Sequence, residues 1–108
     1  MRRGDVITVA VAGDFGKPRP AIVIQSNWLA DTDSVLVCLM TSTLRDATLY
    51  RVDIPATAET GLRVPSQAMA DKLFAIRRDK CGAIIGRLDA ATTARLNSAL
   101  SLAIGLVD

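Results

Sequence analysis

Histidine is absent from this 108-residue chain, and cysteine occurs only twice. The lack of histidine removes the commonest metal ligand and the commonest general base of enzymes. Cys38 lies in the apolar run Val35 to Met40, which is typical of a buried thiol. Neither Cys38 nor Cys81 belongs to a C-x-x-C pair, so nothing supports a zinc site. We therefore expect neither a metal nor another cofactor.

Excess charge of one sign and long apolar runs are also lacking. Thirteen basic and eleven acidic residues leave a formal charge of +2. This charge is too small to indicate nucleic-acid binding by itself, although a local groove can still be basic. No apolar stretch reaches the roughly 20 residues that cross a bilayer, and no apolar signal segment follows Met1. We therefore expect a cytoplasmic protein with no membrane partner.

Short apolar and β-branched segments recur along the chain, separated by turn residues. They predict strands at 6–11, 21–25, 35–40, 50–54 and 83–88. The unbroken apolar run 21–25 indicates burial on both faces of a sheet. The segment 66–76 is ambiguous, since 67–71 suits a strand and the remainder suits a short helix or a turn.

The C-terminal segment has the residue spacing of a helix. Its apolar stripe lies between an N-cap candidate, Asp89, and a stop signal, Gly105. The stripe consists of Leu96, Ala99, Leu100, Ala103 and Ile104. It forms either core or an interface with a second copy. Strands followed by one terminal helix predict a mainly β fold, a small antiparallel barrel or curled sheet in a single domain, 1–108.

Five segments resemble the MazF/PemK toxin family, and they occur in the family's order. They are R-G-D-V at 3–6, G-K-P-R-P at 16–20 before an apolar strand, M-T-S at 40–42, the segment 66–76 with Asp71, and I-G-R-L-D at 85–89 before the last helix. The resemblance implies an SH3-like barrel and a homodimer. It also implies a toxin that cuts single-stranded RNA with sequence selectivity and that an acidic antitoxin holds in check.

The chain departs from this family at two places. The loop 12–18 is short compared with that of many members. Met69 stands where some relatives place an arginine, two residues before the acidic residue. The second departure bears on any mechanism that needs a second arginine at this position.

Three residues are candidates for catalysis. The guanidinium of Arg19, held between Pro18 and Pro20, suits the charge that develops on a phosphoryl group, or it pairs with a nearby carboxylate. Thr41 resembles the family's catalytic threonine, and its hydroxyl either donates to phosphate or bonds its own backbone. Asp71 acts either as the base toward a ribose 2′-OH or as a partner of a neighbouring cation.

A second set of residues is a candidate for binding RNA. Basic and loop residues suit phosphate contacts, and side-chain amides and hydroxyls suit the edges of unstacked bases. This set is Lys17, Pro18, Ser42, Thr43, Ser66 and Gln67. Arg45 and Arg51 are further candidates for phosphate, although a solvated charge is commoner for each. Phe15 and Trp28 offer either stacking faces or packing.

The reaction class follows from the side chains that the chain has. Without histidine no Cys/His or Ser/His nucleophile pair exists, so the substrate's 2′-OH is the expected nucleophile, and no metal is expected to assist it. Two alternatives share the fold: a CcdB-like gyrase poison, and a barrel that binds RNA or protein without cutting. The first requires a C-terminal Trp-Gly-Ile, whereas this chain ends Gly105-Leu106-Val107-Asp108.

Overall fold

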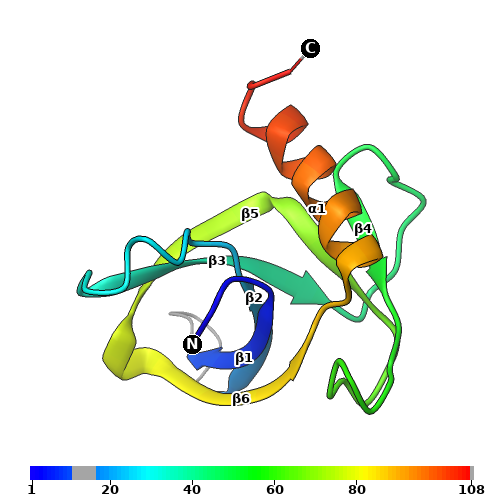
Figure 1. Ribbon diagram of the computed structural model, residues 1–108. Helices are drawn as coiled ribbons and strands as arrows, with labels where there is room; N and C mark the ends of the chain where they lie inside the picture. The colour runs from blue at the N-terminus through cyan, green and yellow to red at the C-terminus, as the bar shows by residue number, and fades with distance from the viewer. Residues whose placement is uncertain (11–16, 108) are drawn as a thin grey trace.

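A 6-stranded sheet and one helix make up the computed structural model of the chain, which describes residues 1–10 and 17–107 (Figure 1). A short 3-10 turn, Arg78–Lys80, joins the last two strands. The sheet order is β4-β5-β3-β2-β1-β6, and all the strand pairs are antiparallel. The predicted mainly β fold with one C-terminal helix is confirmed. The elements are β1 (Asp5–Ala10), β2 (Pro18–Val23), β3 (Ser34–Thr41), β4 (Arg51–Ile54), β5 (Ser66–Arg77), β6 (Cys81–Arg87) and α1 (Ala90–Ala103).

Both faces of the sheet are apolar. In β2, Ile22 packs in one cluster with Leu96 of α1, whereas its neighbours Ala21 and Val23 pack in another cluster with Val37 of β3. All five side chains are at most 3% exposed. Successive residues of a strand point to opposite faces, so an unbroken apolar run serves two clusters at once. The predicted burial of the run 21–25 on both faces is confirmed for its strand part.

The sheet is curled but not closed. β4 and β6 end the sheet order, and no pairing joins them in the described part of the chain, so the curled sheet is right and the closed SH3-like barrel is wrong. The β4–β5 connection crosses this seam, where Arg87 N donates to the Glu59 carbonyl at 2.8 Å. Glycines permit the close approach: a Cβ at Gly61 would lie 1.9 Å from the Ile85 carbonyl oxygen.

Helix α1 begins and ends where the sequence predicts. The Asp89 carboxylate accepts a hydrogen bond from Thr92 N at 2.7 Å, and this bond lowers the pKa of Asp89. Gly105 follows the helix with a φ of 80°, the left-handed conformation that ends many helices. Leu96 and Leu100 are buried, whereas Ile104 is 56% exposed. The predicted apolar stripe is therefore core over its first part only.

β5 is longer than the sequence indicates. The expectation of a short helix or turn after residue 71 is wrong, because one strand runs from Ser66 to Arg77. It pairs with β4 near its start and with β3 along its length. Beyond residue 71 the strand is held by its pairing with β3, which outweighs weak local propensities. A register shift between Cys38 and Met40 of β3 accommodates the curl.

β2 lies three residues earlier at its start than the predicted strand. Pro18 and Pro20 belong to it, opposite Ala10 and Thr8 of β1. The strand ends at Val23 because the N–H groups of residues 24 and 25 both bond to the carbonyl of residue 36, which breaks the regular ladder. Residue 11 of the first predicted strand lies outside the described residues.

No helix in the described ranges has the length and apolar character that a bilayer crossing requires.

Candidate active site

Three polar residues form a row across neighbouring strands. Thr41 of β3 lies opposite Gln67 of β5, and Gln67 lies opposite Asp53 of β4. Directly opposite residues share a face of the sheet, with Cβ atoms about 5 Å apart. The fold therefore brings Thr41, Gln67 and Asp53 together; we call them the cross-strand row. The pairing of β2 with β3 runs from Val23 to Ala21, so Arg19 lies on β2 two residues outside it.

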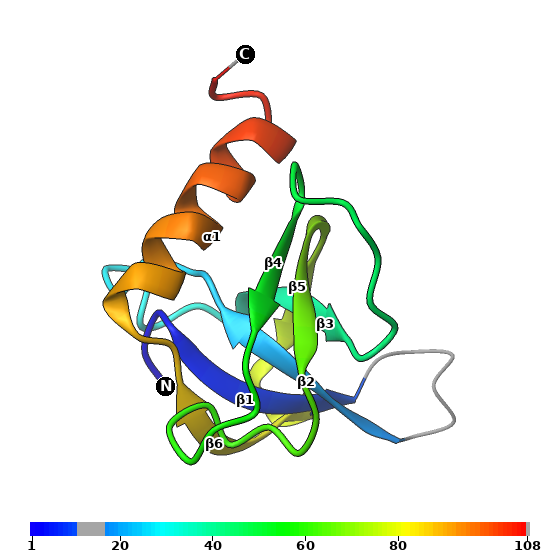
Figure 2. The ribbon, with the colours of Figure 1, turned by 90° about the vertical axis from the view of Figure 1, so that its right-hand side faces the viewer.

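The start of β2 faces solvent. Lys17, Pro18 and Arg19 are all exposed. The start of β2 and the connection from β3 to β4 lie on the same side of the molecule (Figure 2). Exposed basic residues therefore belong to the side of the molecule that also carries the loop after Thr41, and positive charge is what a phosphate backbone would need there.

The Thr41 hydroxyl has a defined orientation. Its Oγ1 accepts a hydrogen bond from Thr43 N at 3.1 Å. The predicted alternative, in which the hydroxyl bonds to nearby backbone, is therefore confirmed. A hydroxyl has two lone pairs and one proton, and this bond uses one lone pair only. The proton is still available for a phosphate oxygen, and the backbone bond and a catalytic role are compatible.

The two loop residues after Thr41 remain accessible. Ser42 and Thr43 are exposed, next to Thr41 at the end of β3. Arg51 Nη1 donates to the Thr43 carbonyl at 2.8 Å. The side chains of this pair can therefore meet a ligand while the backbone beneath Thr43 is held.

Gln67 is only 7% exposed, and its amide is fully used inside the chain. Oε1 accepts from Arg45 N at 3.0 Å and from Arg51 Nη1 at 3.0 Å. Nε2 donates to the Arg45 carbonyl at 2.9 Å and to Asp53 Oδ1 at 3.0 Å. These four bonds exhaust the capacity of a side-chain amide, so contact with a base would require breaking some of them.

Ser66 and Asp71 stand apart from the row. Ser66 is 5% exposed, and its hydroxyl donates to the Val64 carbonyl at 3.1 Å. Asp71 is exposed and pairs with Lys72 at 3.3 Å, the expected alternative of a neighbouring cation. It lies four residues beyond Gln67 on β5, which is about 13 Å along an extended strand. The structure therefore places Thr41 in the row but does not bring Asp71 into it.

Comparison with known proteins identifies the family. The model of the PemK-like, MazF-like toxins of type II toxin–antitoxin systems matches residues 2–104. A probable endoribonuclease MazF of Mycolicibacterium smegmatis is 38% identical over 107 residues, 98% of each chain. Endoribonuclease MazF9 of Mycobacterium tuberculosis is 30% identical, again over 98% of each chain. The chain belongs to the MazF/PemK toxin family. The family and the enzyme class expected from the sequence, an endoribonuclease, are confirmed.

A solved structure shares the fold of this MazF-like chain. It is an endoribonuclease from a mycobacterial species in complex with its cognate antitoxin. The TM-score is 0.82 at 23% identity, covering 100% of this chain and 98% of the other. At this identity the similarity speaks for the fold alone. This chain and the solved endoribonuclease therefore share the curled sheet with one helix.

Position 69, where some relatives carry an arginine and this chain carries Met69, has an arginine opposite it in the sheet. Arg51 of β4 lies directly opposite Met69 of β5. Its Nε is buried and has no hydrogen-bond partner within the described ranges, while Nη1 binds Thr43 and Gln67. In this MazF-like chain a guanidinium therefore lies beside position 69, but from the adjoining strand and already engaged with the loop.

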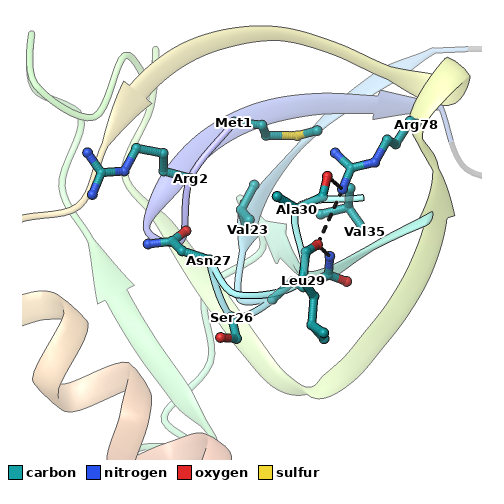
Figure 3. Close-up of a pocket in the computed structure, with 10 residues that line it drawn as sticks. Met1, Arg2, Val23, Ser26, Asn27, Leu29, Ala30, Val35 and Arg78 are labelled. Carbon is teal, nitrogen blue, oxygen red and sulfur yellow. Dashed lines mark hydrogen bonds between the residues drawn. The ribbon is translucent and has the colours of Figure 1, made fainter. Parts of the chain in front are cut away.

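A pocket of about 400 Å³ lies at the opposite ends of β2 and β3 from Arg19 and Thr41 (Figure 3). Its wall includes Val23, Val35 and Arg78, and Arg78 Nη2 donates to the Ala30 carbonyl at 2.9 Å. Trp28, in the same loop as Ala30, is 95% exposed. Of the two expectations for Trp28, packing within the chain is wrong. Phe15 lies outside the described residues.

Sequence reasoning missed the connected group around Gln67. Arg51 was considered as a phosphate contact, and Asp53 was not considered. The sequence does indicate that Arg51 and Asp53 share one face of β4, because they flank Val52 and side chains alternate along a strand. Their meeting with Gln67 depends on the register of β4 and β5, which no local pattern reveals.

Proposed function

We propose that this MazF-like chain cuts single-stranded RNA without a metal, by attack of the substrate's own 2′-OH on the adjacent phosphorus. The upstream product then ends in a 2′,3′-cyclic phosphate and the downstream product in a 5′-hydroxyl. The observation that supports this proposal is the position of Arg19 near the start of β2 and of Thr41 at the end of the neighbouring antiparallel strand β3, which would offer a cation and a hydroxyl donor to one phosphate.

In this reaction Arg19 stabilises the negative charge that grows on the phosphoryl oxygens. The Thr41 hydroxyl donates to one of those oxygens while its lone pair is held by Thr43 N. Asp71 is the proposed acceptor of the 2′ proton. Its carboxylate is exposed and lies on β5, four residues beyond Gln67, so RNA would have to cross from Arg19 over Thr41 toward it.

RNA binding is proposed at the accessible residues on the same side. Lys17 and Pro18 precede Arg19, and Ser42 and Thr43 follow Thr41. Exposed cations and hydroxyls at these places suit the phosphate–sugar backbone. Ser66 and Gln67 support this surface from within the sheet, because both are buried and bonded internally.

The proposed partner is an acidic antitoxin that covers the Arg19 side of the molecule. A solved relative was determined in complex with its cognate antitoxin. An acidic segment can mimic the charge of RNA and order itself on binding. We also propose a homodimer in the cytoplasm. The exposed apolar end of the helical region, with Ile104 at 56% and Leu106 at 72% exposed, supports a contact with a second copy.

Product analysis tests the reaction. Purified protein is incubated with RNA of mixed sequence, with and without EDTA, and the ends are determined by mass spectrometry. We expect cyclic phosphate and 5′-hydroxyl ends in both conditions. A substrate with a single deoxyribose at the cut site should bind but stay intact. Ends bearing 5′-phosphate, or loss of cutting in EDTA, would refute the mechanism, and no cutting at all would favour a non-catalytic binding protein.

A further inference from the structure

The loop that follows Thr41 is held by side chains from the two strands beside it. Three backbone groups of this loop take part in such bonds. Arg51 donates to the Thr43 carbonyl, and Gln67 accepts from the N–H of Arg45 and donates to its carbonyl. The bonds are 2.8 to 3.0 Å long. Gln67 thus binds residue 45 as a neighbouring strand would, through one acceptor and one donor.

Arg51 and Gln67 also bind each other, and this makes one unit of them. Arg51 Nη1 donates to both Gln67 Oε1 and the Thr43 carbonyl. Asp53 Oδ1 accepts from Gln67 Nε2 at 3.0 Å, which sets the orientation of the amide. We call Arg51, Asp53 and Gln67 the loop clamp. A fully bonded polar group of this kind has few alternative arrangements.

The clamp reaches Thr41 through one more bond. Thr43 N donates to Thr41 Oγ1, while the Thr43 carbonyl is held by Arg51. The position of residue 43 therefore sets the direction from which the Thr41 hydroxyl accepts a hydrogen bond, and this restricts the directions in which its proton can point. Thr41 itself is opposite Gln67 in the sheet, so the clamp also supports the strand beneath it.

We infer that Arg51 and Gln67 are positioning residues, which hold the loop so that Thr43 N aims the Thr41 hydroxyl at the scissile phosphate. This inference rests on the proposed function. This positioning role differs from the roles that the sequence suggested, which were a phosphate contact for Arg51 and a base contact for Gln67. The buried Nε of Arg51 and the four internal bonds of Gln67 favour the positioning role. Loss of the clamp should slow the reaction and leave RNA affinity unchanged.

The experiment compares rate with affinity in Arg51→Lys, which keeps the positive charge but loses the planar fork. Single-turnover cutting of an RNA that the unaltered protein cuts should slow about 10- to 100-fold, the scale for small misplacement of a catalytic group. Binding of the same RNA with deoxyribose at the cut site should change less than about twofold on this account. The matched control is Arg77→Lys on β5, whose exposed guanidinium pairs with Asp79 at 2.9 Å; it should behave as the unaltered protein.

A double-mutant cycle tests whether the clamp acts through Thr41. Thr41→Val removes the hydroxyl and keeps the branched shape of the side chain. In that background Arg51→Lys should cause little further loss, because the group that it positions is gone. Full multiplication of the two losses, or a fall in affinity equal to the fall in rate, overturns the inference.

The outcomes separate this inference from the proposed function. Suppose that the unaltered protein cuts RNA, that Thr41→Val lowers this cutting and that Arg51→Lys cuts normally. The proposed function then stands, and the positioning role of the clamp is overturned. No cutting by the unaltered protein overturns both. If Arg51→Lys does not fold, Gln67→Glu carries the same comparison, since it retains the accepting oxygen and removes both donations. Normal cutting by that variant also counts against the clamp.

Discussion

The guanidinium of Arg87 donates to the Asp5 carboxylate at 2.6 Å and so joins β6 to β1. Asp5 is 7% exposed, and its second oxygen accepts from Arg2 N at 2.7 Å. The Arg-Gly-Asp segment near the N-terminus is thus part of the framework of the sheet. It lies away from the cross-strand row, and its carboxylate has no role in the proposed reaction.

Asp5→Asn should lower the free energy of unfolding by about 1–2 kcal/mol, because the hydrogen bond to Arg87 loses its negative charge. The loss is limited because Arg87 is half-exposed, so that solvent screens the ion pair. Urea unfolding at neutral pH measures the change. Asp79→Asn is the matched control, since its ion pair with Arg77 is exposed, and it should cost at most about 0.5 kcal/mol. Equal losses in the two variants would contradict the structural role of Asp5.

Arg19→Ala should slow RNA cutting about 10²-fold or more, the scale for removing one preorganised charge stabiliser. Its fold should persist, because Arg19 is an exposed side chain near the start of β2. Single-turnover rates and thermal unfolding measure the two effects. Arg63→Ala, which removes an exposed arginine from the β4–β5 connection, is the control for loss of charge alone. A similar slowing in both variants would remove Arg19 from the site.

Thr41→Ser should retain most of the cutting rate, whereas Thr41→Val should lose about 10-fold or more, since only the first keeps a hydroxyl donor for phosphate. Both variants keep a small side chain at the end of β3, so their unfolding temperatures should be close. The pair is compared at saturating protein on one RNA. Equal rates for Ser and Val would show that the hydroxyl serves the loop alone.

Gly61→Ala should destabilise the chain far more than Gly105→Ala. Both glycines have positive φ, 71° and 80°, so each substitution carries the same backbone cost of about 1 kcal/mol. At Gly61 the new Cβ meets the β6 backbone, whereas at Gly105 none of the described residues lies within 4 Å of the new Cβ. We expect a further loss of at least about 1–3 kcal/mol at Gly61 from overpacking, measured by urea unfolding. Equal losses would mean that the seam is looser than described.

Unfolding free energy should fall as pH rises from about 9 toward 12 because of Cys38. Burial raises the pKa of this thiol to about 12, against a smaller lowering effect from a backbone hydrogen bond with Met69. The unfolded chain releases the proton near its ordinary pKa, about 9, while the native chain keeps it, so the native state is disfavoured by up to about 1.4 kcal/mol per pH unit.

The measurement is urea unfolding at pH 8 and pH 10 under reducing conditions. Cys38→Ala should lose less stability between these pH values than the unaltered chain. Cys81→Ala is the control, because Cys81 is only partly buried and should alter the pH dependence less. Identical pH dependence in the unaltered chain and Cys38→Ala would contradict the burial of the thiol as a neutral group.

The sequence by itself determined the elements whose signals are local. Asp89 and Gly105 mark the ends of α1 because an N-cap carboxylate and a left-handed glycine act within one turn. The apolar run at 21–25 predicted a strand buried on both faces, because the two-residue period of a strand is written in consecutive residues. Arg19 and Thr41 were identified as catalytic candidates through family motifs, and nothing in their spacing shows whether they meet.

Tertiary structure alone decided how the strands register and what each polar side chain touches. Gln67 reads as a possible base contact in the sequence, yet the alignment of β5 with β3 and β4 buries it against Arg45, Arg51 and Asp53. Shifting a strand by one residue would reverse the face of each of its side chains. Such contacts join residues 14 to 22 positions apart, so they depend on the whole sheet. That is why family motifs could point to Arg19 and Thr41 as candidates, whereas the clamp could not be predicted.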